Sequence, residues 1–231
     1  MANDIVYVLK NDIKSDELIY SLRSVCENFK FRKIWFYGGC PDNVQPDNYV
    51  NFQQQGSDKW SKTRSMYVDI FNNDSITENF YLFNDDFYIM KPYEQDIPRT
   101  NGSLYMQVSR ILKRNHGRQS NYTDRLYRTA QMLRSRHLDV ISYETHTPFL
   151  INRNKGLTIC TTFASHHIFR STYGNFYNIG GILLPDIKIH EKDRIPDDNA
   201  DVVSSTDRSF TQGDIGEYIR KQFPVPCRYE L

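Results

Sequence analysis

The sequence contains no long hydrophobic run. In its 231 residues, no apolar stretch approaches the roughly 18 to 20 residues that a membrane-spanning helix requires. The first residues lead directly into a strand-like segment at residues 4–9 and show no signal-peptide pattern. We therefore expect no membrane span and an intracellular, cytoplasmic location.

Cysteine is scarce, and its four copies lie far apart in the sequence, at Cys26, Cys40, Cys160 and Cys227. None belongs to a CxxC pair of the kind that structural zinc sites use, and a disulfide-based fold has denser cysteines. The thiols are therefore expected to be reduced.

Internal repeats and low-complexity segments are also absent. The hydrophobic fraction of 39% and the charged fraction of 25% are ordinary for a globular protein, and 16 Tyr and 14 Phe provide ring surface that demands burial. A chain of this length can bury one substantial core, so a single domain over residues 1–231 is predicted.

Net charge is small, at +1, but the charges are segregated along the chain. Residues 107–137 contain eight Lys and Arg side chains against one acid, Asp124, which gives this segment a net charge of +7. This stretch lies in a polar region at about residues 100–138, which is predicted to be a basic helical insertion with a helix at 123–138.

Strand-like and helix-like segments alternate over the first hundred residues. Continuous apolar runs predict strands, and apolar residues at helical spacing predict helices after Asp16 and at 59–72. This alternation favours an α/β fold with a mixed, mostly parallel, Rossmann-like sheet flanked by helices. A long loop is expected at 191–209, before a last helix at 215–222. The predicted strands are residues 5–9, 33–37, 49–52, 80–83 and 87–90.

An acidic cluster, Asn84-Asp85-Asp86, follows the apolar strand at 80–83. In open α/β sheets, ligands collect at the carboxyl ends of strands. In an extended chain Asn84 and Asp86 would point to one side and Asp85 to the other. Such carboxylates can hold Mg²⁺ or Mn²⁺, which would neutralise the diphosphate of a nucleotide-activated sugar as it leaves. The competing interpretation is a polar turn between two strands, where Asn and Asp are favoured.

Three blocks of the sequence resemble, in order, the conserved blocks of the Stealth family of capsular-polysaccharide sugar-phosphotransferases. They are DELIYSLRSV at 16–25, FYLFNDDF at 80–87 and HTP at 146–148. That family is in turn similar to glycosyltransferases of the GT-A fold, whose metal site is an Asp-x-Asp-type motif after a strand. The resemblance implies a GT-A-like fold and a metal site with Asp86 as the main ligand and Asp85 beside it.

Several cationic side chains are candidates for holding the donor phosphates. The resemblance implies that Arg23 lies near the donor, where a guanidinium can grip a phosphate with two hydrogen bonds. Lys62 and Arg64 precede the acidic strand on a predicted helix, and Arg170 lies in a later polar stretch. The alternative for each is a solvated surface charge.

The remaining candidates are acids, an amide and an imidazole. Glu144 and His146 stand two residues apart before a predicted strand, where either can act as a general base or as a further metal ligand, and Asp85 is a third catalytic candidate. Asn84 is expected to orient the donor. Asp207 is expected in a polar loop that closes over the donor.

These features together predict a metal-dependent glycosyltransferase that uses a nucleotide-sugar donor. The basic segment predicts an anionic polymer as acceptor, either a phosphate-bearing glycan or a nucleic acid such as DNA with a hydroxylated base. The competing interpretation is that its arginines are solvated on an exposed helix or pair with the acidic residues at 191–201. A Stealth-type sugar-1-phosphate transferase and a non-enzymatic nucleic-acid-binding module remain alternatives. The side chains expected to contact the acceptor are Arg110, Lys113, Arg114, Arg118, Arg125 and Arg128.

Overall fold

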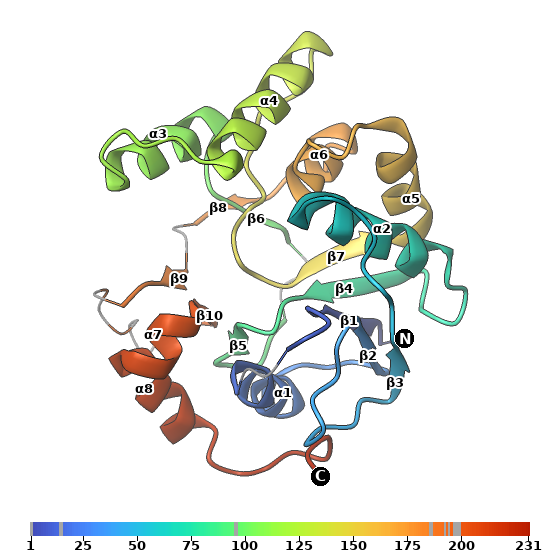
Figure 1. Ribbon diagram of the computed structural model, residues 1–231, viewed down its shortest axis with the longest axis vertical. Helices are drawn as coiled ribbons and strands as arrows, with labels where there is room; N and C mark the ends of the chain where they lie inside the picture. The colour runs from blue at the N-terminus through green and yellow to red at the C-terminus, as the bar shows by residue number, and fades with distance from the viewer. Residues whose placement is uncertain are drawn as a thin grey trace.

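The computed structural model describes residues 2–13, 16–94, 97–184, 187–191, 193, 195 and 200–231. Within these ranges the chain forms eight helices and ten strands, arranged as a mixed α/β fold (Figure 1). The helices of this described part lack the combination of length and apolar character that membrane crossing requires.

The central sheet has the strand order β3-β2-β1-β4-β7. Four strands run parallel, and only the edge strand β7 is antiparallel to its neighbour β4. The prediction of a mostly parallel sheet is confirmed. Its strands read as continuous apolar runs because both faces of a parallel sheet are covered. Their bounds are β1 (Asp4–Val8), β2 (Ile34–Tyr37), β3 (Asn48–Val50), β4 (Asn79–Phe83) and β7 (Phe149–Asn152).

Helices cover both faces of this sheet (Figure 1). Alternate residues of β1 separate the two cores: Ile5 and Tyr7 pack with α1 (Glu17–Asn28), whereas Val6 packs with the other helices on the opposite face. Those helices are α2 (Lys59–Asn72), α5 (Arg153–Thr162) and α6 (Phe169–Phe176). The helix predicted at 59–72 is confirmed at both ends.

The order of the strands reverses between β1 and β4. From β1 the chain builds outward through β2 to β3, and α2 then carries it back to β4 on the other side of β1. Connections that leave two neighbouring parallel strands in opposite directions open a crevice at the strands' carboxyl ends. The topology therefore places a ligand-sized opening beside the loops that follow β1 and β4.

A second, smaller sheet lies beside α1. It has the order β5-β10-β9, with bounds β5 (Phe87–Ile89), β9 (Lys188–Ile189) and β10 (Val202–Ser205). The helices α7 (Asp207–Gln212) and α8 (Asp214–Gln222) pack on it through Phe210, Ile215 and Ile219. A two-stranded sheet, β6 (Arg99–Thr100) with β8 (Ile182–Leu183), completes the strands of the described ranges.

The prediction of a loop at 191–209 is wrong for its second half, which forms β10 and the start of α7. Val202 and Val203 are buried because β5, more than a hundred residues earlier, provides the partner strand. Residues 192, 194 and 196–199 of the predicted loop lie outside the described residues.

The basic segment forms a pair of helices, α3 (Leu104–Arg114) and α4 (Asn121–Ser135), hereafter the α3–α4 hairpin. It lies at the top of Figure 1, away from the central sheet. Its own apolar cluster consists of Leu104, Leu126, Ala130 and Leu133, with Ile168 from the segment before α6. The helix predicted at 123–138 begins two residues earlier, at a capping box made by Ser120.

The chain ends in a tail after α8 that returns to α1. Arg23 of α1 forms a bidentate ion pair with Glu230, at 2.8 and 2.6 Å, and also donates to the carbonyl of Phe223. The four cysteines are free, and the thiols of Cys26 and Cys227 lie close enough to hydrogen bond.

Candidate functional site

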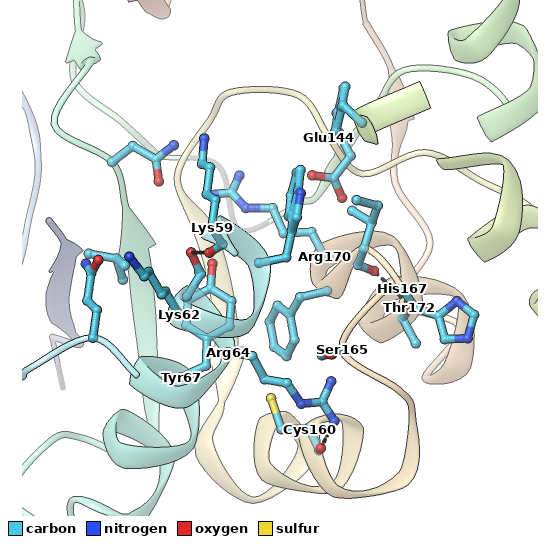
Figure 2. Close-up of a pocket in the computed structure, with 18 of the residues that line it drawn as sticks. Lys59, Lys62, Arg64, Tyr67, Glu144, Cys160, Ser165, His167, Arg170 and Thr172 are labelled. Carbon is cyan, nitrogen blue, oxygen red and sulfur yellow. Dashed lines mark hydrogen bonds between the residues drawn. The ribbon is translucent and has the colours of Figure 1, made fainter. Parts of the chain in front are cut away.

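A cavity of about 880 Å³ opens at the carboxyl ends of β1 and β4. Its walls are α2 on one side and α5, α6 and the segment before β7 on the other (Figure 2). This is the position that the reversal of strand order predicts. Seven of the residues singled out in the sequence line it, namely Lys62, Arg64, Asn84, Asp85, Glu144, His146 and Arg170.

The loop after β1 forms part of the cavity wall and is fixed by its neighbours. The carbonyl of Leu9 accepts a hydrogen bond from the Gln54 side chain, and the Asn11 side chain donates to the carbonyl of Phe52, both at 2.9 Å. Gly38 has a φ of +106°, and a Cβ there would lie 2.1 Å from the Leu9 carbonyl oxygen. Because Gly38 has no Cβ, the backbone that follows β2 can pack directly against the loop after β1.

Cationic side chains outnumber carboxylates in the lining of the cavity, five to three. Arg64 crosses from α2 to donate to the backbone carbonyls of Cys160 and Phe163, which ties the two walls together. Sequence reasoning missed two of the cations, since neither Lys10 nor Lys59 belongs to a recognisable motif. The five cationic side chains that line the cavity are Lys10, Lys59, Lys62, Arg64 and Arg170.

Arg170 is buried, at 8% exposure, and its orientation is fixed. It donates to the carbonyl of Thr147 at 2.8 Å, and its guanidinium lies 5.6 Å from the ring centroid of Phe87 and 5.4 Å from that of Phe149. A guanidinium held between aromatic rings keeps its remaining N–H groups in a defined direction.

Glu144 is the acid on the same side of the cavity as Arg170. One of its carboxylate oxygens accepts hydrogen bonds from the Oγ and the backbone N–H of Ser171, at 2.9 and 3.2 Å. Burial raises the pKa of Glu144, and the positive charge of Arg170 and the bonds from Ser171 oppose that rise. The result is a carboxylate with a fixed position and an elevated pKa, which is the combination a general base needs.

His146 lines the cavity and has a left-handed backbone conformation, as His116 and His137 also do. Its φ is +50°, in the left-handed region that side chains with a Cβ seldom adopt. Such residues persist where the surrounding structure holds them, and they concentrate at functional sites.

The acidic cluster is a turn rather than an extended strand, with Asp85 and Asp86 in the turn between β4 and β5. The expectation that Asn84 and Asp86 share one face is therefore wrong, because the alternation of side chains holds only in extended backbone. Asn84 and Asp85 line the cavity, and Asp86 does not.

Asp86 lies behind the cavity wall. Its Oδ2 is paired with Lys188 and accepts a hydrogen bond of 3.1 Å from Ser204, while its buried Oδ1 has no hydrogen-bond partner among the described residues. Burial, and secondarily the charge of Asp86, raises the pKa of Asp85 to about 6. The neighbouring carboxylate of Asp86 thus makes ionisation of Asp85 less favourable.

Glu17, at the start of α1, is a buried acid that sequence reasoning did not single out. It is 1% exposed and accepts a hydrogen bond from Ser205. Burial raises its pKa, as do a hydrogen bond with Asp207 and the nearby charges of Asp86 and Asp85. No sequence pattern reveals this proximity, because it depends on the second sheet folding against α1.

The protein atoms alone do not complete a metal centre. Across the ranges that the structure describes, no group of three or more His, Cys, Asp or Glu side chains is arranged to hold a metal ion. Mg²⁺ and Mn²⁺ at sites of phosphate transfer are commonly held by one or two carboxylates, with phosphate oxygens of the substrate and water as the other ligands. Asp85 and the buried Oδ1 of Asp86 match that smaller donor set.

Two residues predicted to bind the donor are not among those that line the cavity. Arg23 is occupied by Glu230 and by the ring of Tyr20, 4.7 Å from the guanidinium carbon. Asp207 is the first residue of α7, and its hydrogen bond is to Glu17. The sequence did not reveal these pairings, because each joins α1 to the C-terminal part of the chain, about 190 residues or more away.

The predicted acceptor-binding residues lie on the α3–α4 hairpin. Arg125 is half-buried and reaches Asp58 at 3.4 Å, and Arg128 pairs with Asp124 at 2.8 Å within α4. Arg114 contacts the ring nitrogen of His190 at 2.8 Å, and Arg110 donates to the carbonyl of Asn101. Exposed positions of the hairpin carry Arg110, Lys113, Arg114, Arg118 and Arg128.

Compared with known proteins, the chain matches no family model and no curated protein.

Proposed function

We propose that this protein is a metal-dependent glycosyltransferase of the GT-A-like type, which moves a sugar from a nucleotide-sugar donor to a hydroxyl on an anionic polymer. The observation that carries the proposal is the cavity at the reversal of strand order, where five cations meet the carboxylates Asp85 and Glu144. The resemblance of the three sequence blocks to the Stealth family supports the same conclusion.

The cations supply what a nucleoside diphosphate leaving group requires. A diphosphate gains negative charge as the bond to the sugar breaks, and fixed positive groups in a partly closed site stabilise that charge strongly. Lys62 and Arg64 face the cavity from α2, with Lys59 one turn earlier and Lys10 on the loop after β1. A cavity of about 880 Å³ is within the usual size for a ligand of this kind.

A divalent cation fits beside the acidic turn. Asp85 would hold it from the cavity side, and the buried Oδ1 of Asp86, which has no hydrogen-bond partner among the described residues, lies in the same turn. When bound, Mn²⁺ or Mg²⁺ would add positive charge next to the donor phosphates. Asn84, beside these acids, would orient the donor.

Glu144 is the general base in this proposal. Its carboxylate is positioned by Ser171 and lies opposite the cations of α2 (Figure 2). In the transfer step, the acceptor hydroxyl gives its proton to Glu144 as its oxygen bonds to the anomeric carbon, and the nucleoside diphosphate departs with the electron pair of the broken bond. Arg170 and His146 border the same space and hold the reacting groups in place.

The test is donor binding and its dependence on metal. A thermal-shift screen of nucleotide sugars with and without Mn²⁺ should show a rise in melting temperature only for the cognate donor, because a ligand that binds the native state stabilises it. The matched control is Lys62→Ala, which should abolish the shift while leaving the melting temperature of the free protein unchanged. A screen in which no nucleotide stabilises the wild-type protein contradicts the proposal.

Product analysis separates this function from sugar-1-phosphate transfer at the same site. Transfer of a sugar leaves a nucleoside diphosphate, whereas transfer of a sugar phosphate leaves a nucleoside monophosphate. Mass spectrometry of the released nucleotide decides between them. A protein that binds polyanions through the α3–α4 hairpin and turns over no donor would be a binding module instead.

A further inference from the structure

Two aromatic rings from different elements stack at the wall of the cavity. Trp60, in the first turn of α2, and Tyr122, in the first turn of α4, have ring centroids 5.8 Å apart and planes inclined by only 4°. Both rings line the cavity and both are half-buried. Each side chain therefore keeps part of its surface exposed at the cavity. This pair is called the aromatic platform below.

Cations border the aromatic platform. The guanidinium carbon of Arg125 lies 5.0 Å from the Trp60 ring centroid, and Nζ of Lys59 lies 5.8 Å from it. Arg125 is fixed by Asp58 at 3.4 Å and by the carbonyl of Ser165 at 3.1 Å. The same Asp58 caps α2 through the backbone N–H groups of Trp60 and Ser61. Asp58 thus fixes both the start of α2, which carries Trp60, and the guanidinium of Arg125 beside it.

The platform joins the cavity to the α3–α4 hairpin. Tyr122 and Arg125 belong to α4, and Trp60 packs against the apolar cluster of the hairpin. Asp85 and Lys10 follow β4 and β1, which lie below α2 in Figure 1, while α4 lies above it. A ligand on the platform therefore reaches the cavity from the hairpin side.

We propose that the aromatic platform binds one unstacked base of a single-stranded or locally opened nucleic acid, whose backbone runs along the basic face of the α3–α4 hairpin. This rests on the proposed function and names its acceptor class. Flat aromatic rings stack on every base, and exposed cations bind the backbone by releasing its counterions. A phosphate-bearing glycan would meet the cations but has no planar ring to stack.

The platform serves the acceptor rather than the donor because of its surroundings. Arg125 and Tyr122 sit on the hairpin that carries the exposed basic side chains, whereas the donor cations Lys62 and Arg64 point into the cavity from further along α2. Glu144, the proposed base for the acceptor hydroxyl group, lines the same cavity as the platform.

Tryptophan fluorescence offers a direct test, because the chain has only two tryptophans. Trp35 is 6% exposed and donates its Nε1–H to Asp4 at 3.0 Å, so only Trp60 is open to a ligand. A short single-stranded oligothymidylate should quench the emission of Trp60. Inorganic polyphosphate, a polyanion without bases, should bind in a competition assay without quenching it.

Substitutions then separate stacking from charge. Trp60→Leu should weaken oligothymidylate binding by about ten-fold or more, since stacking on one aromatic ring stabilises each bound base appreciably. Trp60→Phe should recover part of that affinity, and the affinity for polyphosphate should change less than about two-fold in both. The matched control is Tyr127→Leu, an exposed tyrosine of α4 that packs edge-on against Tyr105 and does not line the cavity. It should bind both polyanions normally.

The inference would be overturned if Trp60→Leu weakened the binding of oligothymidylate and of polyphosphate equally. It would also be overturned if Trp60→Leu lost donor-induced stabilisation but still bound oligothymidylate normally. Melting curves of each variant establish that it is folded. If the leucine variant does not fold, Trp60→Phe still allows the test. Failure of the proposed function has a different signature, namely no donor stabilisation in the wild type while the stacking results stand.

Discussion

The cavity and the α3–α4 hairpin both contain many charged side chains, but several of those in the cavity are held by partners, whereas several on the hairpin are exposed to solvent. In the cavity, Arg64, Arg170 and Glu144 are held by specific partners, and burial raises the pKa values of Glu144 and Asp85. On the hairpin, Lys113 and Arg118 extend into solvent.

This difference predicts two kinds of binding. Buried, fixed charges act at short range, so a single substitution has a large effect that salt barely changes. Exposed charges act together, each substitution has a small effect, and salt weakens all of them. Substitutions in one region should therefore leave the behaviour of the other intact, and the following predictions are ordered from the largest expected effect to the smallest.

Asp85→Asn should lower metal-dependent donor turnover by about 100-fold or more, the effect typical of removing one electrostatic stabiliser of a reacting group. Because the pKa of Asp85 is raised to about 6 in the metal-free protein, protons should compete with the metal, and the metal concentration needed for half-maximal turnover should rise as the pH drops below about 6. Chromatography of the released nucleotide measures both effects. Asp124→Asn, which removes an exposed acid of the hairpin, should have normal turnover.

The same substitution at Asp85 should stabilise the unliganded protein, since a carboxyl group with a raised pKa costs the folded state stability as the pH rises through that pKa. The increase in melting temperature should therefore be present at about pH 8 and absent at about pH 4. A uniform decrease in stability at both pH values would show that Asp85 is structural and would contradict the assignment.

Replacing Lys113, Arg114, Arg118 and Arg128 together by alanine should weaken polyanion binding by about ten-fold or more at moderate salt. The slope of log affinity against log salt should become shallower by about 0.7–0.9 for each phosphate that the variant no longer neutralises. Fluorescence titrations at several salt concentrations measure this slope. Donor-induced stabilisation should be unchanged, and its disappearance would mean that the two regions are not separable.

Ser171→Ala should move the acidic limb of the pH–activity profile to higher pH. The reason is that the hydrogen bonds from Ser171 lower the pKa of Glu144 against the rise that burial causes. Without the hydroxyl, the carboxylate protonates at a higher pH and can no longer act as a base there. Initial rates across the pH range test this, with Ser135→Ala at the exposed end of α4 as control. An unshifted limb would exclude Glu144 as the base.

Glu17→Gln should raise the melting temperature at alkaline pH by about 2–4 °C for each kcal/mol of stability regained. Burial raises the pKa of Glu17, so the wild type is most stable below the ordinary pKa of glutamate and becomes less stable as the pH rises above it. The variant should not show this decrease. In calorimetry, the control Glu27→Gln, at an exposed position of the same helix, should show the same pH dependence of the melting temperature as the wild type. If Glu17→Gln also shows the wild-type pH dependence, buried Glu17 does not destabilise the protein.

The sheet could be predicted from sequence because its signal is local. The apolar runs of β1, β2 and β4 are continuous, and α2 is marked by apolar residues at helical spacing, so both were found. β10 and α3 were missed because their sequences are short or basic, and they become ordered only against β5 and α4.

The candidate site was predicted in part. The structure brings Lys62, Arg64, Asp85, Glu144 and Arg170 to one cavity, although the first and last of them lie more than a hundred residues apart in sequence. Lys10, Lys59 and the Trp60–Tyr122 platform were missed, since nothing in a single sequence indicates that two rings 62 residues apart are stacked.

The sequence by itself determined the alternation of strands and helices, the acidic residues after β4 and the basic character of the hairpin, because each depends on neighbours along the chain. Tertiary structure decided which charges are available. Arg23 is held by Glu230 and Asp86 by Lys188, while Asp85 faces the cavity. The state of a charged side chain depends on the partners and the burial that folding provides, and those come from distant parts of the chain.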